Sequence, residues 1–209
     1  IFVAAAIYSG DIIQIAAALT SETGILGSPL ALVVALAFGM CSSMIAISAP
    51  CVSLEGKGLW LIRSLPVPAK KIIGAKFAFH ALVAGIPMAV FSAATTAVIK
   101  IPFLPAALAV VFAVLTVVFF DALGLYIDVK SPNFNWTNPT VPIKQSISVM
   151  AVILGGMGVV AVFSACFFAV KGFMSPTAYL AIITALVAAA CFFTVYRLFG
   201  KGVARFDAL

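Results

Sequence analysis

The residues of this sequence that could do chemistry are few, and many of them stand in one short segment. The segment SLEGKGLWLIRSLPVPAKK, residues 53–71, holds one Glu, three Lys, one Arg and one of the two Trp of the chain. Its EGKG stretch differs from a phosphate-binding loop, which needs G-x-x-x-x-G-K-[ST] so that backbone amides can surround a phosphate. We therefore expect that this chain does not hydrolyse ATP itself.

The remaining polar residues form no catalytic or metal-binding pattern. The single His, His80, stands in an apolar stretch, and none of the four Cys has the C-x-x-C spacing of a metal site. One His cannot complete a zinc site without such cysteines. The sequence predicts no catalytic residue, no bound metal and no cofactor.

The composition points to a membrane protein. Only 9% of the residues are charged and 65% are hydrophobic, whereas soluble domains have about 25% charged and roughly 45–50% apolar residues. The alternating strands of about ten residues that build a membrane barrel are absent. Helices satisfy their own backbone hydrogen bonds in lipid, so we expect an all-α membrane protein.

Six apolar stretches are long enough to span a bilayer, which needs about 20 residues. They cover residues 1–20, 29–49, 72–99, 102–127, 147–170 and 176–199. The expected fold is a single transmembrane domain, residues 1–209, built as a bundle of six transmembrane helices. Because the sequence starts inside an apolar stretch without Met, we expect a fragment that lacks its N-terminal part.

The basic residues predict an orientation. Two longer polar segments connect the spans: the first polar loop, residues 50–71, and the second polar loop, residues 128–146. Of the 12 Lys and Arg, all but two fall on one side of the six-span layout; they are Lys57, Arg63, Lys70, Lys71, Lys76, Lys130, Lys144, Arg197, Lys201 and Arg205. Only Lys100 and Lys171 fall on the other side. Cytoplasmic loops are enriched in Lys and Arg, so both polar loops and the C-terminus are expected in the cytoplasm.

The first polar loop predicts a short amphipathic helix. Ser53 is a candidate N-cap and Glu55 falls in the first turn, where the helix dipole favours a negative charge. The LWLI stretch supplies an apolar face, and Pro66 and Pro68 end the element. Two interpretations fit such a helix: an anchor in the lipid headgroup layer, or a docking element for a cytoplasmic partner.

Both polar loops resemble one family. The stretch SLEGKGLWLIRSLPVPAKKIIGAKF is similar to a motif of bacterial ABC transporter permeases of the type-2 exporter class, at Glu55, Gly56, Lys57, Trp60, Arg63, Ser64, Leu65, Pro66 and Lys76. The stretch DVKSPNFNWTNPTVPIKQS resembles the same family at Asp128, Pro132, Trp136, Asn138, Lys144 and Gln145. It departs from the family pattern at Asn133, Asn135 and Pro139, the last being a position where an acidic residue is expected.

This resemblance implies a permease, the C-terminal half of a longer one, that works with a separate ABC ATPase subunit in a bacterial cell membrane. The ATPase subunit would bind the ATP and receive a coupling helix from the first polar loop. The contact residues would be Glu55, Gly56, Lys57, Trp60, Arg63 and Pro66, with Asp128, Pro132, Trp136 and Lys144 in the second polar loop. Membrane lipid and a second permease half or copy are the other expected partners, and no nucleic acid is expected.

Five polar residues fall inside the expected spans, where an ionisable group is costly and faces the bundle interior or water. Asp11 and Gln14 stand one turn apart, as do Lys76 and His80, and Asp121 lies near the end of its span. They could line a substrate path or form a conformational switch. Alternatively they are structural, for example as a pair of Asp11 with Lys76, or through Lys76 reaching to the interface.

Other functions remain open at this point. The chain could be a membrane anchor or regulatory scaffold that holds a cytoplasmic partner without transporting anything. An intramembrane enzyme is disfavoured because no catalytic constellation is present, and a secondary transporter because interrupted spans are not evident. The GGMG stretch, which contains Gly155, Gly156 and Gly158, is interpreted as a close helix contact.

The distribution of charge predicts where a reagent can reach the chain. In a cysteine-free background, a single Cys at position 100 or 171 should react with a membrane-impermeant maleimide on intact cells, because those positions face outward. A Cys at position 57 or 130 should react only after the cells are permeabilised. Efficient labelling of position 57 on intact cells would contradict the six-span topology.

Overall fold

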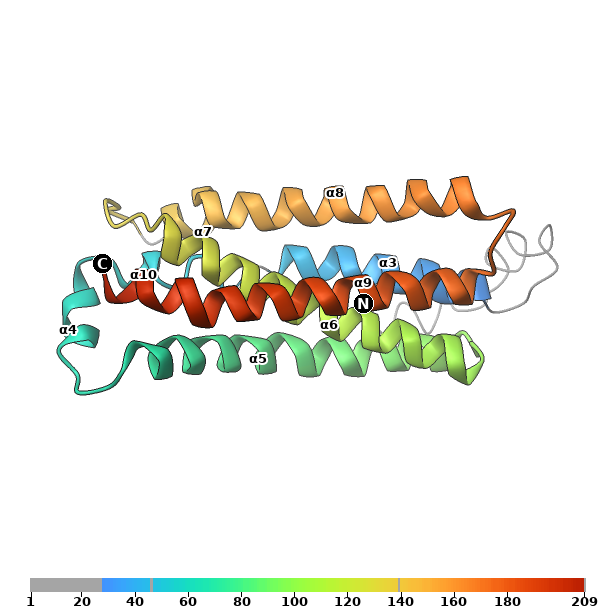
Figure 1. Ribbon diagram of the computed structural model, residues 1–209, viewed down its shortest axis with the longest axis horizontal. Coiled ribbons are helices and arrows are strands. Elements are labelled where there is room, and N and C mark those ends of the chain that lie inside the picture. The colour runs from blue at the N-terminus through green and yellow to red at the C-terminus, as the bar shows by residue number, and fades with distance from the viewer. Residues whose placement is uncertain (1–27, 46, 139, 209) are drawn as a thin grey trace.

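The computed structural model describes residues 28–45, 47–138 and 140–208 (Figure 1). Within these ranges the side chains of Ser28, Lys57, Arg63, Lys144 and Gln145 are not described. The first expected span, residues 1–20, lies outside the described residues together with Asp11 and Gln14. The six-span count therefore stays a prediction.

All regular secondary structure in the described ranges is helical. The long helices are α3 (Ser28–Met44), α5 (Ala69–Val98), α6 (Phe103–Lys130), α8 (Ile147–Val170) and α9 (Pro176–Arg197). The short ones are η1 (Ser53–Gly58), α4 (Leu59–Arg63), α7 (Thr140–Gln145), η2 (Leu198–Gly202) and α10 (Val203–Asp207). Among the described residues, the four helices that contain α5, α6, α8 and α9 are long and apolar enough to cross a membrane. These are the features of a multi-pass membrane protein.

Helix α6 is the centre of the bundle. It contacts α3, α5, α8 and α9 (Figure 1). Ala109 and Ala113 of α6 are fully buried, and a Cβ added at Gly124 would lie only 3.0 Å from the Cβ of Ala49. Small residues let helix backbones approach closely, which matters in lipid because apolar side chains gain little there by leaving the solvent.

The outer faces of the other helices are apolar as well. Phe79 on α5, Leu154 on α8 and Phe192 on α9 are all exposed. Exposed apolar surface of this extent is unusual for a soluble monomer, whereas hydrocarbon solvates it. The bundle is therefore built for lipid on its outer surface.

Helix α3 ends earlier than its apolar stretch predicts. The expected span 29–49 is a helix only to Met44, and the following residues Ser48, Ala49 and Pro50 turn back into a buried position. Pro50 removes a backbone donor and disfavours helical geometry in the residue before it. The hydroxyls of Ser42 and Ser43 also bond to carbonyls of the preceding turn, which loosens a helix end.

The two ends of the bundle differ in charge, as the sequence predicts. The basic end carries both polar loops, α4, α10 and the C-terminal segment, whereas the opposite end carries the short turns at Lys100 and Lys171 (Figure 1). Helices α5, α6, α8 and α9 each run from one end to the other, whereas the shorter α3 stops part-way along the bundle (Figure 1). The connections of these four helices therefore alternate between the basic end and the opposite end.

Only one glycine of the GGMG stretch makes the close contact that we expected. A Cβ at Gly156 would overlap the side chain of Ser43 on α3 and lie 3.1 Å from the ring of Phe120 on α6. A Cβ at Gly155 or Gly158 would meet nothing within 4 Å. Of the three glycines, Gly156 is therefore the one at which α8 lies in close contact with α3 and α6.

This difference gives a matched pair of substitutions. Gly156→Ala should lower the melting temperature of the purified chain in detergent, because overpacking a close contact costs about 1–3 kcal/mol. Gly155→Ala should be neutral or stabilising, since Ala is about 1 kcal/mol better than Gly inside a helix. Equal melting temperatures for the two variants would show that α8 does not depend on this contact.

Candidate functional site

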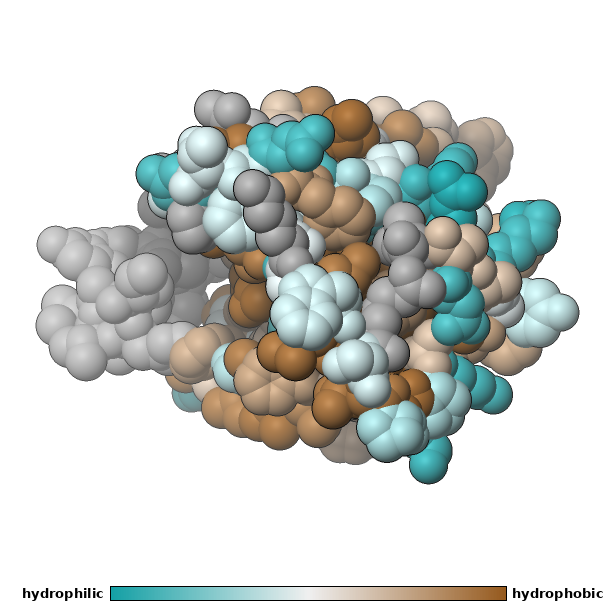
Figure 2. Space-filling model, turned by 90° about the vertical axis from the view of Figure 1, so that its left-hand side faces the viewer, coloured by the Kyte–Doolittle hydropathy of each residue, from teal (hydrophilic) through white to brown (hydrophobic). Residues whose placement is uncertain are grey.

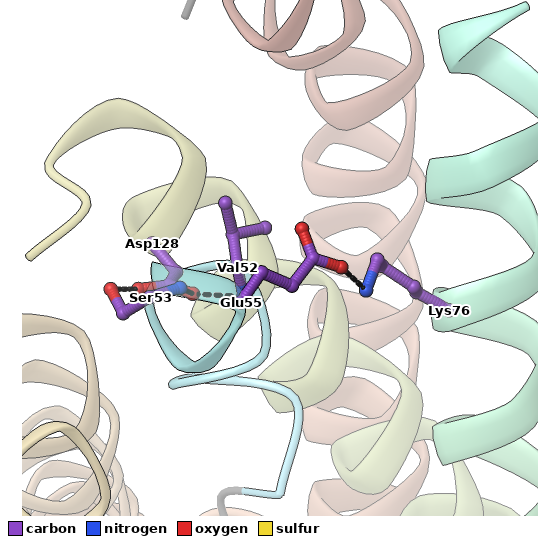
Figure 3. Close-up of polar contacts among 5 residues, drawn as sticks. All are labelled: Val52, Ser53, Glu55, Lys76 and Asp128. Atoms are coloured by element: carbon purple, nitrogen blue, oxygen red, sulfur yellow. Dashed lines mark hydrogen bonds and ion pairs between the residues drawn. The ribbon is translucent and has the colours of Figure 1, made fainter. Parts of the chain in front are cut away.

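The carboxylate of Asp128 joins the two polar loops. Asp128 lies in the last turn of α6 and is fully buried. It accepts hydrogen bonds from the backbone N–H of Val52 at 2.6 Å, the backbone N–H of Ser53 at 3.0 Å and the hydroxyl of Ser53 at 2.5 Å (Figure 3). The hydroxyl of Ser148, at the start of α8, adds a longer contact of 3.4 Å. A buried carboxylate needs such donors, so the start of η1 is held against α6.

Ser53 also accepts two hydrogen bonds from the second polar loop. Its hydroxyl oxygen accepts from the backbone N–H of Asn133 at 3.0 Å, and its carbonyl accepts from the indole N–H of Trp136 at 2.7 Å. We call the contacts of Ser53 with Asp128, Asn133 and Trp136 the loop clamp. The expected role of Ser53 as an N-cap is not what the structure has, because η1 shows no side-chain cap.

Gly56 makes room for Trp136. Its φ is 50°, in the region that L side chains rarely adopt, and a Cβ there would lie 2.9 Å from Cζ2 of the indole. Any other residue would be strained and would push the indole away. This kink lies inside η1, so the single helix expected from the sequence is interrupted at Gly56 and is followed by the separate short helix α4.

An ion pair attaches the first polar loop to α5. Lys76 donates from Nζ to Oε1 of Glu55 (Figure 3), and both side chains are largely buried. The structure thus gives Lys76 a loop carboxylate as its partner rather than a position reaching into water. One turn further along α5, Nδ1 of His80 is buried and has no hydrogen-bond partner among the described residues, and the same holds for Oε2 of Glu55.

The chemistry of this cluster is not that of a nucleophile or a metal site. Burial raises the pKa of the nearby Cys51 thiol to about 11, against the opposing pull of the Lys76 ammonium. The thiol therefore stays neutral near pH 7, and a neutral thiol is a poor nucleophile. No group of three or more metal-ligating side chains occurs among the described residues. The arrangement instead fixes the position of a surface element.

That element is α4 with the turn that follows it. Leu59 is buried with Val52, Ile73 and Phe206 in the apolar cluster of the basic end, and this holds α4 in place. The next residues point outward: Trp60 is 69% exposed. We call the exposed apolar residues Trp60, Leu61, Leu65 and Val67 the α4 patch. Trp60 is thus exposed on a short helix whose position is fixed by the buried Leu59 and by the neighbouring loop clamp.

The residues that the sequence assigned to partner contact divide into two sets. Trp60 and Pro66 are exposed, whereas Glu55 and Gly56 face the protein interior and take part in the contacts above. Lys57 and Arg63 lie in η1 and α4, and their side chains are outside the description. Glu55 and Gly56 therefore help to hold the first polar loop in position.

In the second polar loop, Asp128 and Trp136 also face inward and hold the clamp, while Pro132 is half-buried. Lys144 lies in α7, and its side chain is outside the description. Helix α7 itself was not predicted, because its TVPIKQ sequence is short and contains a proline. The two loops that the resemblance singled out are thus in direct contact with each other.

Asp121 and several hydroxyls form a buried polar row that was predicted only in part. Asp121 is 4% exposed; its carbonyl accepts from the Ser48 hydroxyl at 2.9 Å, and its Oδ2 has no partner among the described residues. Further along α6, the hydroxyl of Thr116 pairs with that of Ser42 at 3.1 Å. In the sequence, the only indication of this row is the presence of Ser and Thr residues in stretches that are otherwise apolar.

Comparison with known proteins adds no relative. The chain matches no protein-family model, no curated protein and no solved structure.

The loop clamp predicts a graded loss of stability. Asp128→Ala leaves two buried backbone donors without an acceptor and should cost about 2 kcal/mol or more, seen as a lower melting temperature in detergent and faster cleavage of the first polar loop by trypsin. Asp128→Asn keeps one acceptor oxygen and should fall between Asp128→Ala and the wild type.

Serine substitutions provide the control. Ser53→Ala should also release the loop, whereas Ser64→Ala should not, because the exposed Ser64 hydroxyl bonds only to the carbonyl of Leu61 in its own turn. If Ser53→Ala and Ser64→Ala are cleaved at the same rate, the clamp does not hold the loop.

Proposed function

We propose that this chain is the membrane-spanning permease subunit of an ATP-driven ABC transporter of the exporter type, which contacts a separate ATPase subunit through the α4 patch. The observation that carries the proposal is that the two loops resembling this family touch one another through the loop clamp. The motif residues that face inward are the ones that position α4, and Trp60 is left exposed.

The proposed function requires that movement of an ATPase reach the spans. Three attachments provide rigid routes from the first polar loop. Glu55 is ion-paired to Lys76 on α5, Ser53 is bonded to Asp128 on α6, and Leu59 belongs to the same buried apolar cluster as Phe206 beyond α9. A force on α4 would therefore act on three helices at once, which suits a coupling element.

The charge of the basic end supports a cytoplasmic position. Ten of the 12 Lys and Arg belong to segments that meet at this end, and cytoplasmic segments are enriched in these residues. The proposal therefore places the polar loops and the C-terminus in the cytoplasm of a bacterial cell, where the ATPase and its ATP are. The proposal names no transported substrate.

The α4 patch is also compatible with a second function, that of a lipid-anchored scaffold. A tryptophan and leucines beside basic residues can lie in the headgroup layer. In that case Trp60 would contact lipid and the chain would hold its partner by other surfaces. The two functions differ in what happens to the partner when the bilayer is removed.

Capture of the partner in detergent distinguishes them. The tagged chain, solubilised from membranes, should retain an ABC ATPase subunit, identified by mass spectrometry. Trp60→Ala should weaken this association by roughly tenfold or more, because buried aromatic anchors contribute about 2 kcal/mol or more to an interface. Phe173→Ala removes a still more exposed aromatic ring at the opposite end and should have no effect.

Two outcomes of this experiment would contradict the proposal. If wild type, Trp60→Ala and Phe173→Ala retain the ATPase equally, α4 is not the contact, and an anchor in lipid remains. If the wild type retains no ABC ATPase at all, the transporter assignment itself is wrong.

A further inference from the structure

A groove opens on the surface of the basic end, between the start of α5 and the C-terminal extension of α9. Its volume is about 640 Å³. Three basic residues line it: Lys70 from α5, Arg197 from the last turn of α9 and Lys201 from η2. Three aromatic residues, Phe192, Tyr196 and Phe199, supply apolar wall. We call it the α5–α9 groove.

The walls of the groove are fixed by packing. Leu198, Gly202 and Phe206 follow one another at intervals of four residues and are all buried, so the π-helical turn η2 keeps one face on the bundle. Phe199 contacts Phe77 of α5 edge to face, with ring centroids 6.2 Å apart. The groove therefore has a defined shape, and π-helical turns are frequent at functional sites.

The charge in the groove has one sign. No acidic side chain lines it in the described part of the chain. Lys70 and Lys201 are exposed and form no ion pair with another described residue. The guanidinium of Arg197 lies 4.8 Å from the ring centroid of Phe193 of the same helix, a ring outside the groove lining, and this contact leaves the positive charge of Arg197 without a counter-charge among the described residues. Three cations without a counter-charge favour an anionic ligand.

The groove also spans two environments. Arg197 is the last residue of α9 and Lys70 is in the first turn of α5, so these cations lie where both helices leave the apolar layer. Phe192 and Tyr196 precede Arg197 on α9 and are exposed, on the part of the helix that is apolar enough to lie in a membrane. Figure 2 views this end of the molecule and shows hydrophilic side chains interspersed with hydrophobic ones. A ligand filling the groove would be charged at one end and apolar at the other.

We propose that the α5–α9 groove binds one molecule of anionic phospholipid. The phosphate would lie between Lys70, Arg197 and Lys201, and an acyl chain would lie along Phe192 and Tyr196. Basic pockets between transmembrane helices are a recognised way of holding such headgroups, and a free phosphate would leave the aromatic wall unused. This inference stands independently of the proposed transporter function, because it needs only a membrane-spanning bundle.

Lipid titration followed by native mass spectrometry tests the charge requirement. The full chain, purified in mild detergent, is titrated with phosphatidylglycerol or with phosphatidylcholine of the same acyl chains. One phosphatidylglycerol should bind at least roughly tenfold more tightly than phosphatidylcholine. The groove variant Lys70→Gln/Arg197→Gln/Lys201→Gln should lose this preference by roughly 10- to 100-fold in affinity.

A matched variant controls for net charge. Lys71→Gln/Lys100→Gln/Lys171→Gln removes the same charge outside the groove, including the neighbour of Lys70, and should keep the preference. Equal affinity of the wild type for the two lipids, or an equal loss in both triple variants, would overturn the proposal. If the groove variant does not stay folded, the single change Lys201→Gln at an exposed position should still weaken phosphatidylglycerol binding several-fold, and no change there would equally overturn it.

A second arm separates a lipid from a free phosphate compound. Glycerol 3-phosphate carries the phosphate without acyl chains and should fail to displace phosphatidylglycerol. Phe192→Ala/Tyr196→Ala should weaken lipid binding, whereas Phe168→Ala/Phe173→Ala, which removes exposed aromatics elsewhere, should not. Displacement by glycerol 3-phosphate, with no effect of the wall variant, would show a phosphate site and refute a lipid site.

Discussion

A buried carboxylate that must find hydrogen-bond donors is the constraint on which the basic end depends. Asp128 lies at the end of the central helix, surrounded by apolar residues such as Leu125 and Val129. An ionised or protonated carboxyl group in such surroundings is costly unless its oxygens are bonded. The donors come from the turn at Val52 and Ser53, so burial of one side chain determines where the first polar loop lies. Trp136 and Gly56 pack around the same turn. The position of this turn determines where α4 lies and which of its faces is exposed.

Polar contacts are important in this bundle because lipid weakens the hydrophobic driving force for helix association. Apolar side chains gain little from leaving hydrocarbon, so helices in a bilayer associate through close backbone packing and hydrogen bonds. The central helix uses both: Gly124 and Ala113 allow close approach, and Thr116, Asp121 and Asp128 face hydroxyls of neighbouring segments. The outer faces need no such features and are simply apolar. Polar and small residues are thus placed at the contacts between helices, within an interior that is otherwise apolar, and the exterior is apolar as well, unlike that of a soluble bundle.

The sequence predicts the long helices well because their signals are local. The limits of α8 agree with the expected span 147–170, and α9 begins at Pro176 as expected, since Ser-Pro and polar turns mark those ends. The early end of α3, the break at Gly56 and the pairing of Lys76 with Glu55 were not predicted. Each depends on contacts between residues far apart in the chain; the Ser53 hydroxyl and Asp128, for instance, are 75 residues apart. The two motifs could be recognised from the sequence, but their contact could not, because no local pattern encodes which loop a carboxylate will bind.

The basic end is also a place where several surfaces share one support. Leu59 beneath the α4 patch and Leu198 and Phe206 beneath the α5–α9 groove belong to the same buried cluster. Packed interiors transmit displacement because they contain few voids into which a side chain can move. A shift of α4 would therefore displace Leu59 within the cluster that also holds the extension of α9, in addition to its action on α5 through Lys76. The C-terminal extension, which by sequence is only a short basic tail, thus becomes a structural part of the loop assembly, because Leu198 and Phe206 help to form the buried cluster to which Leu59 of α4 belongs.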